Sequence, residues 1–181
     1  MGHTLVIYES MYGNTEVIAR AIGRGLGECG SVDVIEVAAA PTSVPADVAV
    51  LVVGGPTHAF GMSRQSTRAD AAKQAERPVI SADVGVREWL EGLSLGPARP
   101  FVAAFDTHVE HPKLLRHVGS AAASIERRLA RLGLDIVAPA EHFWVHGSLG
   151  PLVDGERDRA ETWGREIVRR LELTPAVPPV A

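Results

Sequence analysis

Residues 9–15, Glu-Ser-Met-Tyr-Gly-Asn-Thr, bring together groups that could hold an anion. The segment offers three hydroxyls, one amide and one glycine, at Ser10, Tyr12, Thr15, Asn14 and Gly13. Apolar residues at helical spacing follow, so the backbone N–H groups would enter a helix N-terminus, where the helix dipole favours negative charge. No lysine or arginine lies in the segment. Neutral donors of this kind suit the phosphate monoester of a buried cofactor.

Two other interpretations of this segment compete with a phosphate site. A turn followed by an ordinary helix cap, made by Asn14 or Thr15, needs no ligand. A nucleoside triphosphate would normally recruit a lysine and a metal, but the G-x-x-x-x-G-K-[ST] pattern is absent. The glycines of residues 23–27 imitate a dinucleotide motif, yet they would lie inside the helix. We expect them to pack closely or to end the helix.

Short apolar runs alternate with helical patterns along the chain. Strands are predicted at 5–8, 32–37, 48–53 and 101–105, with a fifth in two pieces at 136–137 and 142–145. Helical spacing covers 17–26, 68–76, 86–93, 122–132 and 160–171. The alternation predicts an α/β fold, a three-layer αβα sandwich around a five-stranded parallel sheet of order 2-1-3-4-5. Ligands of such sheets bind beyond the carboxyl ends of the strands.

One domain is expected over residues 1–173, with a Pro-rich, disordered tail at 174–181. The polar stretch 54–78 is longer than a usual connection, and long loops are commonly functional. For the helix over 86–93 we expect Ser81 or Asp83 as the cap.

The first loop, as strand, Ser10-x-Tyr12-Gly13-Asn14-Thr15 and helix, resembles the phosphate loop of flavodoxins, typically [ST]-x-T-G-N-T. Residues 54–61, Gly-Gly-Pro-Thr-His-Ala-Phe-Gly, resemble the second flavin loop of that family, and residues 105–108, Phe-Asp-Thr-His, stand at the third. The resemblance spans roughly residues 4–171 and implies a flavodoxin-like fold that binds FMN. The implied cofactor-binding residues are Ser10, Met11, Tyr12, Gly13, Asn14, Thr15, Pro56, Thr57, His58, Ala59, Phe60, Gly61, Phe105, Asp106, Thr107 and His108.

The flavin ring needs flat apolar or aromatic faces, which His58, Phe60 and His108 could supply. Phe60 could equally anchor its loop, and Phe105, at the end of a strand, suits the core. The resemblance also implies that the backbone near Gly61 tunes the one-electron potentials of the flavin. We expect Arg64 and Arg68, with His58 and His108, to place positive charge near the ring and to make the second potential less negative than in an acidic flavodoxin. If both arginines are solvated instead, this effect disappears.

Composition excludes several other classes of protein. A net charge of -4 and the lack of a basic block argue against nucleic-acid or membrane partners. No apolar run is long enough to span a bilayer, and no signal peptide precedes the first strand, so a cytoplasmic location is expected. Histidines recur at His108, His111, His117, His142 and His146, but no established metal-binding motif accompanies them, and we predict no metal site.

The resemblance favours an electron-transfer flavoprotein, which serves a redox partner protein or a small-molecule acceptor. An NAD(P)H-dependent FMN or quinone reductase is the alternative, because the 62–78 segment could shape a substrate pocket. A non-catalytic binding or regulatory module with the same fold is the alternative of another class.

Overall fold

Five parallel strands form one sheet in the order β2-β1-β3-β4-β5, which confirms the predicted topology. The computed structural model describes residues 2–110 and 119–173, so the 174–181 tail, His111 and His117 lie outside the described residues. The strands are β1 His3–Tyr8, β2 Val32–Glu36, β3 Val48–Pro56, β4 Phe101–Val109 and β5 Glu141–Val145. The helices are α1 Asn14–Leu26, α2 Gln65–Gln74, α3 Val86–Gly92, α4 Ala121–Arg131 and α5 Glu156–Leu173, with short 3-10 turns η1 Gly27–Cys29 and η2 Val37–Ala39.

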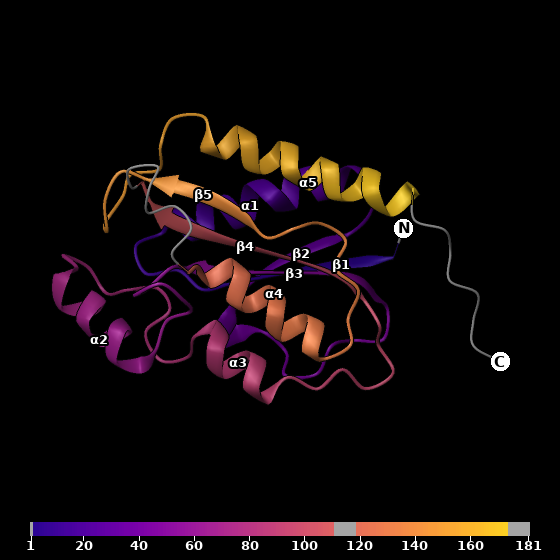
Figure 1. The fold of residues 1–181 in the computed structure, drawn as a ribbon, viewed down its shortest axis with the longest axis horizontal. Helices are drawn as coiled ribbons and strands as arrows, with labels where there is room; N and C mark the ends of the chain where they lie inside the picture. The colour runs from indigo at the N-terminus through magenta and orange to yellow at the C-terminus, as the bar shows by residue number, and fades with distance from the viewer. Residues whose placement is uncertain (1, 111–118, 174–181) are drawn as a thin grey trace.

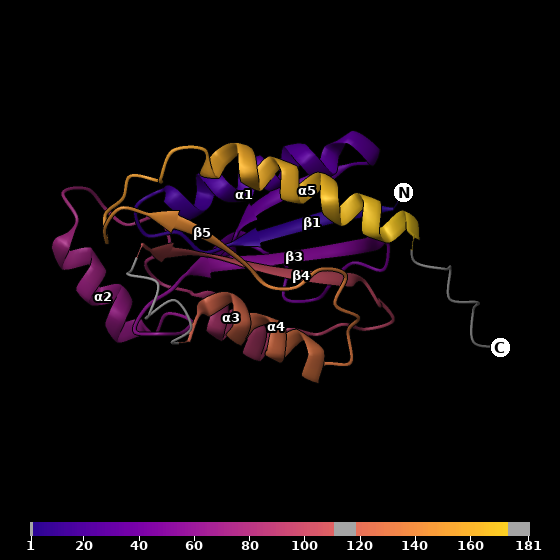
Figure 2. The same ribbon diagram turned by 45° about the horizontal axis from the view of Figure 1, so that its top comes forward.

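The sheet lies between two layers of helices (Figure 1). Helices α1 and α5 cover one face, whereas α3 and α4 cover the other, as the turned view also shows (Figure 2). Helix α2 stands apart from both layers, beyond the carboxyl ends of the strands (Figure 1). The polar 54–78 stretch therefore builds a wall at the edge of the sheet where ligands bind in this class of fold.

Alternating side chains of each central strand feed two separate cores. Leu5 and Ile7 of β1 pack in the cluster that holds the buried residues of α3 and α4. Val6 and Tyr8 point the other way, into the cluster that holds the apolar stripes of α1 and α5. Period-two alternation of a strand places successive side chains on opposite faces, and here both faces are apolar because both are covered.

The central strands are longer than their apolar runs. β3 continues to Pro56 and β4 continues to Val109, beyond the predicted ends at 53 and 105. Polar residues therefore stay in the ladder, where Gly55 pairs with Asp106 and Pro56 with Thr107. An apolar pattern does not reveal these residues as strand, because their side chains belong to the site although their backbones pair in the sheet.

Two predicted helix caps are wrong. Gly13, with a φ of 92°, occupies the cap position of α1 and makes no side-chain cap bond, so neither Asn14 nor Thr15 is the cap. Gly85 precedes α3, and its N–H donates to Glu88 Oε2 at 3.1 Å, so the cap is neither Ser81 nor Asp83. Of the predicted caps, Asn14, Thr15 and Ser81 have other hydrogen-bond partners.

Helices α1 and α5 touch backbone to backbone. A Cβ added at Gly25 would lie 2.1 Å from the carbonyl oxygen of Glu161, and one at Gly164 would lie 2.5 Å from that of Ile22. Gly25 belongs to the glycine-rich stretch that imitates a dinucleotide motif, and close packing is its observed role. Among the described residues no helix combines the length and apolarity that crossing a membrane requires.

Candidate functional site

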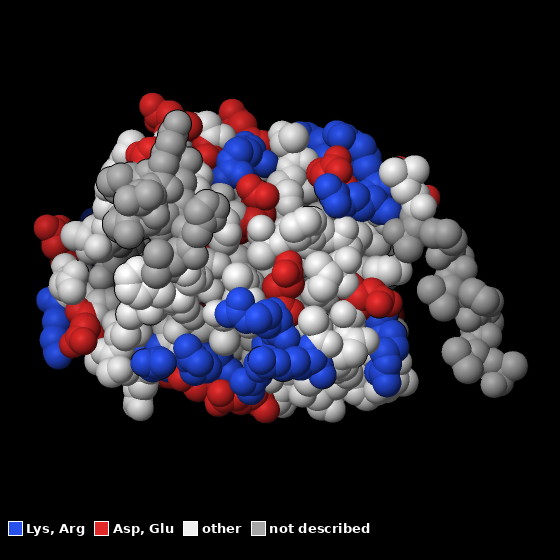
Figure 3. Space-filling model, viewed as in Figure 1, with Lys and Arg blue, Asp and Glu red and all other residues white. Residues whose placement is uncertain are grey.

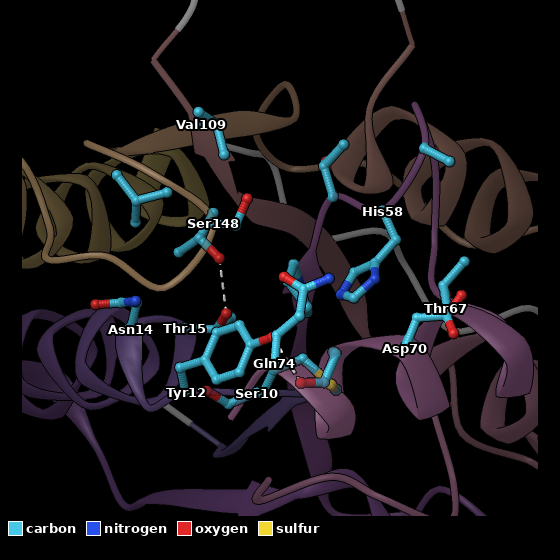
Figure 4. Close-up of a pocket in the computed structure, with 17 residues that line it drawn as sticks. Ser10, Tyr12, Asn14, Thr15, His58, Thr67, Asp70, Gln74, Val109 and Ser148 are labelled. Carbon is cyan, nitrogen blue, oxygen red and sulfur yellow. Dashed lines mark hydrogen bonds between the residues drawn. The ribbon is translucent and has the colours of Figure 1, made fainter. Parts of the chain in front are cut away.

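A cavity of about 300 Å³ opens at the carboxyl ends of β1, β3 and β4, between the first two loops and α2. In Figure 4, Tyr12, Gln74 and His58 face this hollow from the first loop, α2 and the second loop. Ten of the predicted site residues line it, namely Ser10, Met11, Tyr12, Asn14, Thr15, Pro56, Thr57, His58, Ala59 and Thr107. The fold thus brings segments far apart in sequence around one space.

The first loop is held in place by its own serine and by residues 80–81. Ser10 Oγ accepts from the N–H of Gly13 at 3.1 Å and of Glu16 at 3.4 Å. The Ser10 N–H donates to Ser81 Oγ at 3.0 Å, and the Ser81 N–H donates back to the Ser10 carbonyl at 2.9 Å. Ser10 itself is fully buried. Its hydroxyl is a loop constraint, and this leaves the other donors of the loop for a ligand.

Four backbone N–H groups of this loop, at Met11, Tyr12, Asn14 and Thr15, make no hydrogen bond to any described residue. All four residues line the cavity. The first N–H groups of a helix have no partner within it, and here they stand at the positive end of the α1 dipole. The arrangement is one that binds anions in other proteins.

Three side chains of the loop are tied to separate walls of the cavity. The Tyr12 hydroxyl donates to the Ala71 carbonyl of α2 at 2.9 Å, and Asn14 Nδ2 donates to the Leu149 carbonyl at 3.1 Å. Thr15 Oγ1 lies 2.7 Å from Thr107 Oγ1 of β4 (Figure 4). When Thr107 is the donor in that pair, the Thr15 hydroxyl hydrogen is available to an anion.

The second loop makes a strained two-residue turn. Its ends close by two hydrogen bonds, from the His58 N–H to the Gly61 carbonyl at 2.9 Å and from the Gly61 N–H to the His58 carbonyl at 3.0 Å. Ala59 and Phe60 sit at φ values of 43° and 68°, angles at which such turns usually carry Asn-Gly. Left-handed non-glycine residues cost about 1–3 kcal/mol each. The turn nevertheless holds the ring of Phe60 60% exposed, which excludes a loop-anchoring role for it.

Arg68, one of the residues expected to place positive charge near the ring, does not line the cavity. Arg68 is 1% exposed, and its guanidinium donates to Ser63 Oγ and Glu88 Oε2 at 2.9 and 3.1 Å, away from the cavity lining. It is therefore not solvated, although its charge still acts on His58 of the cavity lining. Burial, helped by the charge of Arg68, lowers the pKa of His58 below its usual value, so this ring is neutral at pH 7. The less negative second potential stays a prediction, with Arg64 as the cation that lines a neighbouring hollow.

The third loop divides its side chains between two faces of the sheet. Thr107 lines the cavity. Phe105 is fully buried, and its ring stacks edge-on against Phe143 and Trp163 in the core. Asp106 and His108, one residue either side of Thr107, turn to the opposite face, so that these three predicted residues do not line the cavity. Strand alternation turns Asp106 and His108 away, whereas Phe105 shares the face of Thr107 but lies in the core.

Asp106 is fully buried and has three partners. Oδ2 accepts from the Thr57 hydroxyl and from the Ala122 N–H, both at 2.9 Å, and Oδ1 lies 2.9 Å from His142 Nδ1. The hydrogen bond with Asp106 raises the pKa of His142, against the opposing effect of burial. Thr57 thereby connects the cavity wall with the other face of β4.

Several cavity residues escaped sequence analysis. Thr67, Asp70, Ala71 and Gln74 reach the cavity from α2, and Val109, Val145 and Ser148 line its other side. Helical spacing at 68–76 and the unusual length of the 54–78 stretch both point to α2, but neither identifies which of its side chains line the cavity. Asp70 is the sole acidic residue among the described lining residues, which include no Lys or Arg.

A second hollow of about 220 Å³ adjoins the cavity and shares His58, Ala59 and Thr67 with it. Phe60 and Gly61, the remaining predicted residues of the second loop, line this hollow. Arg64 and Arg87 line it as well. The Arg87 guanidinium donates to the carbonyls of Ser63 and Met62, at 2.9 and 2.8 Å.

Glu9 lies buried at the start of the first loop. One carboxyl oxygen accepts from the Val86 N–H at 2.8 Å, and the other has no hydrogen-bond partner among the described residues. Burial raises the pKa of the Glu9 carboxyl, although the neighbouring Ser63 hydroxyl, the Val86 N–H and the charge of Arg68 oppose the shift. The group connects β1 with the start of α3 beneath the site.

The face of the molecule in Figure 3 carries both signs of charge, with Lys and Arg side chains gathered over α3 and α4.

A family model for flavodoxin matches residues 6–163, most of the chain. The chain belongs to the flavodoxin family. Family membership implies a flavin cofactor, which makes this member of the family a flavoprotein.

Solved structures share the fold of this flavodoxin-family chain. A flavodoxin from the domain Archaea is 18% identical with a TM-score of 0.62, covering 94% of this chain and 99% of that one. Rubredoxin oxygen:oxidoreductase from the anaerobe Desulfovibrio gigas is 18% identical with a TM-score of 0.64, covering 98% and 38%. A flavodoxin, WrbA-like protein from Agrobacterium tumefaciens is 16% identical with a TM-score of 0.54, covering 96% and 99%. No curated protein matches the chain. Such low identities show the fold alone.

Proposed function

We propose that this chain is an FMN-binding electron carrier whose first loop binds the phosphate of the cofactor. The observation that carries the proposal is the set of four N–H groups, at Met11, Tyr12, Asn14 and Thr15, without a partner among the described residues at the positive end of α1. Unmet donors on a cavity wall are costly unless water or a ligand satisfies them. A phosphate monoester would satisfy them without a lysine or a metal.

The rest of the cavity suits the flavin ring. His58 is neutral, and Ala59 and Pro56 add apolar surface, so that the wall near the second loop can pack against a flat heteroaromatic system. A turn with a strained, left-handed backbone holds the ring of Phe60 exposed. Backbone strain of this kind is found at ligand-binding sites and at conformational switches. When bound, FMN supplies one- and two-electron redox chemistry, and the protein orients it and tunes it.

A comparison of FMN with riboflavin tests the phosphate assignment directly. The two ligands share the ring and differ in the phosphate, so the proposal expects FMN to bind the flavin-free protein at least about 100-fold more tightly, the scale of two or more hydrogen bonds to a charged group. Fluorescence quenching titrations measure both dissociation constants. Equal affinities for the two flavins would rule out a phosphate site in the first loop.

Thr15→Val refines this test, because it removes one hydroxyl and keeps the shape of the side chain. We expect FMN affinity to fall by about 10-fold or more and riboflavin affinity to stay unchanged, since only FMN carries the phosphate. Thr4→Val is the matched control, because Thr4 is also buried but lies at the other end of β1. A loss that is equal for both flavins would assign Thr15 to the framework of the cavity.

Gly61 offers a test of redox tuning by the second loop. A Cβ at this position would meet only Ser124 Oγ, at 3.8 Å, so Gly61→Ala introduces no clash. We expect near-normal FMN affinity and a shift in the one-electron potentials, because the substitution restricts the backbone of the turn. Potentials identical to those of the unmodified protein in a redox titration would remove Gly61 from this role.

A second candidate function, an NAD(P)H-dependent FMN or quinone reductase, is favoured by the hollow beside the cavity. Arg64 and Arg87 line this hollow, and both are suited to the phosphates of a nicotinamide nucleotide. Anaerobic bleaching of the protein-bound flavin by NADPH alone would establish this reductase function, and an Arg64→Ser variant should then slow it. Without bleaching, a redox partner protein or small-molecule acceptor is the proposed destination of the electron. A protein that binds neither flavin would instead be a non-catalytic module.

A further inference from the structure

Three metal-ligating side chains meet on the face of β4 and β5 that is turned away from the cavity. Asp106, His108 and His142 each offer one ligand atom, and the three atoms lie within 4.8 Å of one another. Asp106 and His108 are buried, at 0% and 5% exposure, and the His142 side chain is 34% exposed. The cluster is therefore built into the sheet, with one edge toward solvent.

The strand register creates this meeting point. Asp106 pairs with His142 across the ladder, and His108 pairs with Trp144. Residues two apart on a strand share a face, and directly opposite residues of adjacent strands are neighbours, so the three side chains converge. The rings of His108 and His142 stand edge to face with centroids 6.2 Å apart.

The carboxylate is oriented as a ligand would be. Its Oδ2 is fixed by the Thr57 hydroxyl and the Ala122 N–H, whereas Oδ1 is turned toward His142 Nδ1 at 2.9 Å. Metal-binding carboxylates and imidazoles are commonly held by such outer hydrogen bonds. Because Oδ2 is fixed, the direction of Oδ1 is fixed as well. The arrangement of the ligand atoms is therefore partly formed before an ion binds.

We propose that Asp106, His108 and His142 form a binding site for one divalent transition-metal ion of the zinc class. Two imidazoles and one carboxylate suit zinc and its neighbours, whereas magnesium and calcium prefer oxygen ligands. Ligand atoms about 2.1 Å from one ion stand about 3.0 Å apart at a right angle and about 3.4 Å apart at the tetrahedral angle. The observed 2.9 Å between Asp106 and His142 matches the first spacing.

The remaining spacing requires only a small closure. Because all three ligand atoms lie within 4.8 Å, the widest pair would close by at most about 1.4 Å to reach tetrahedral spacing. His142, whose side chain is 34% exposed, stands at the solvent edge of the cluster and would make most of this movement. The positive charge of Arg159 nearby is offset by Glu141 and Glu156, to which it is ion-paired. The site is independent of the flavin, because these side chains do not line the cavity.

Metal titration of the tag-free protein, after dialysis against a chelator, tests the proposal. Calorimetry with Zn²⁺ should give one ion per chain, Co²⁺ should give visible absorption bands from nitrogen and oxygen ligands, and Mg²⁺ should give no binding heat. His142→Ala should weaken Zn²⁺ binding by at least about 100-fold, since loss of a ligand exceeds the 10–100-fold effect of an outer-shell partner. His146→Ala is the matched control, because His146 is exposed and contacts Glu110 instead.

His142→Gln provides a second variant that keeps a polar partner for Asp106, and circular dichroism verifies that both variants fold. One Zn²⁺ ion bound by the unmodified protein and by His146→Ala, but lost from both His142 variants, is the expected pattern. No Zn²⁺ binding at millimolar concentration would overturn the proposal. Binding that survives in both folded His142 variants would overturn it equally, because the ion would then occupy another part of the surface.

Discussion

Replacing Gly25 by alanine should destabilise the protein, although alanine is the better helix former. Alanine would add about 1 kcal/mol of helix propensity in the interior of α1. The new Cβ, however, would stand 2.1 Å from the Glu161 carbonyl oxygen and 3.0 Å from the Arg165 backbone nitrogen. Both are backbone atoms of α5, so no side chain can turn aside. Restoring an ordinary contact of 3.4 Å requires the helices to separate by about 1.3 Å.

The expected loss follows from these opposing terms. Overpacking of a close contact costs about 1–3 kcal/mol, and a clash between two backbones belongs at the upper end of that range. When the gain in helix propensity is subtracted from the cost of the clash, the free energy of unfolding of Gly25→Ala should be lower by about 1–2 kcal/mol. Gly27→Ala is the matched control, because Gly27 ends the same helix at a φ of -67° and its Cβ would meet only Val32 at 3.9 Å. That variant should be more stable by about 0.5 kcal/mol.

Urea unfolding of the flavin-free protein, followed by tryptophan fluorescence and extrapolated linearly to water, measures both variants. The two substitutions make the same chemical change two residues apart, so opposite signs would identify the α1–α5 contact as the cause. A Gly25→Ala protein as stable as Gly27→Ala, with an unchanged dependence on urea, would refute the reasoning.

Three further substitutions test other parts of the structure. Burial raises the pKa of Glu9 above its ordinary 4.5, so the stabilising contribution of this group is full below pH 4.5 and is lost as pH rises through the folded-state pKa. Glu9→Gln should therefore gain stability relative to the unmodified protein between pH 5 and pH 8. If this is wrong, urea unfolding at the two pH values would show a constant difference between the two proteins. Ala59→Gly should raise the melting temperature of the flavin-free protein through a gain of up to about 1 kcal/mol, because glycine tolerates the φ of 43°, and calorimetry showing a decrease would contradict the strain. Glu88→Gln should cost about 1–2 kcal/mol, because it leaves the buried Arg68 without its counter-charge, whereas Glu91→Gln on an exposed pair should cost under about 0.5 kcal/mol in the same unfolding assay.

The first loop and the strand order could be predicted from sequence because their signals are local. Residues 10–15 place hydroxyl, amide and glycine groups next to one another, directly between an apolar strand and a helical pattern. Alternating strands and helices then leave few possible topologies. Only the arrangement of hydrogen bonds within the loop, such as the use of Ser10 to hold Gly13, required the structure.

Other parts of the site depend on contacts that no local pattern contains. Arg68 lies in a polar stretch typical of a solvated surface, and its burial depends on Ser63 and Glu88 closing around it. The meeting of Asp106 with His142 depends on the register of β4 against β5, which is fixed by packing of the whole sheet. A one-residue change in this register would send His142 to the opposite face.

The hydrogen bonds that hold the first loop join it to residues far along the chain. Asn14 bonds Leu149 across 135 positions, Thr15 meets Thr107 across 92, and Ser10 bonds Ser81 across 71. A ribosome therefore makes this loop well before it makes Leu149, the last of these three partners. Long-range contacts of this kind form late in folding, after the entropy of closing large loops has been overcome. No N-terminal fragment can hold the cavity in its final form, and the ability to bind a ligand there marks the completion of the entire fold.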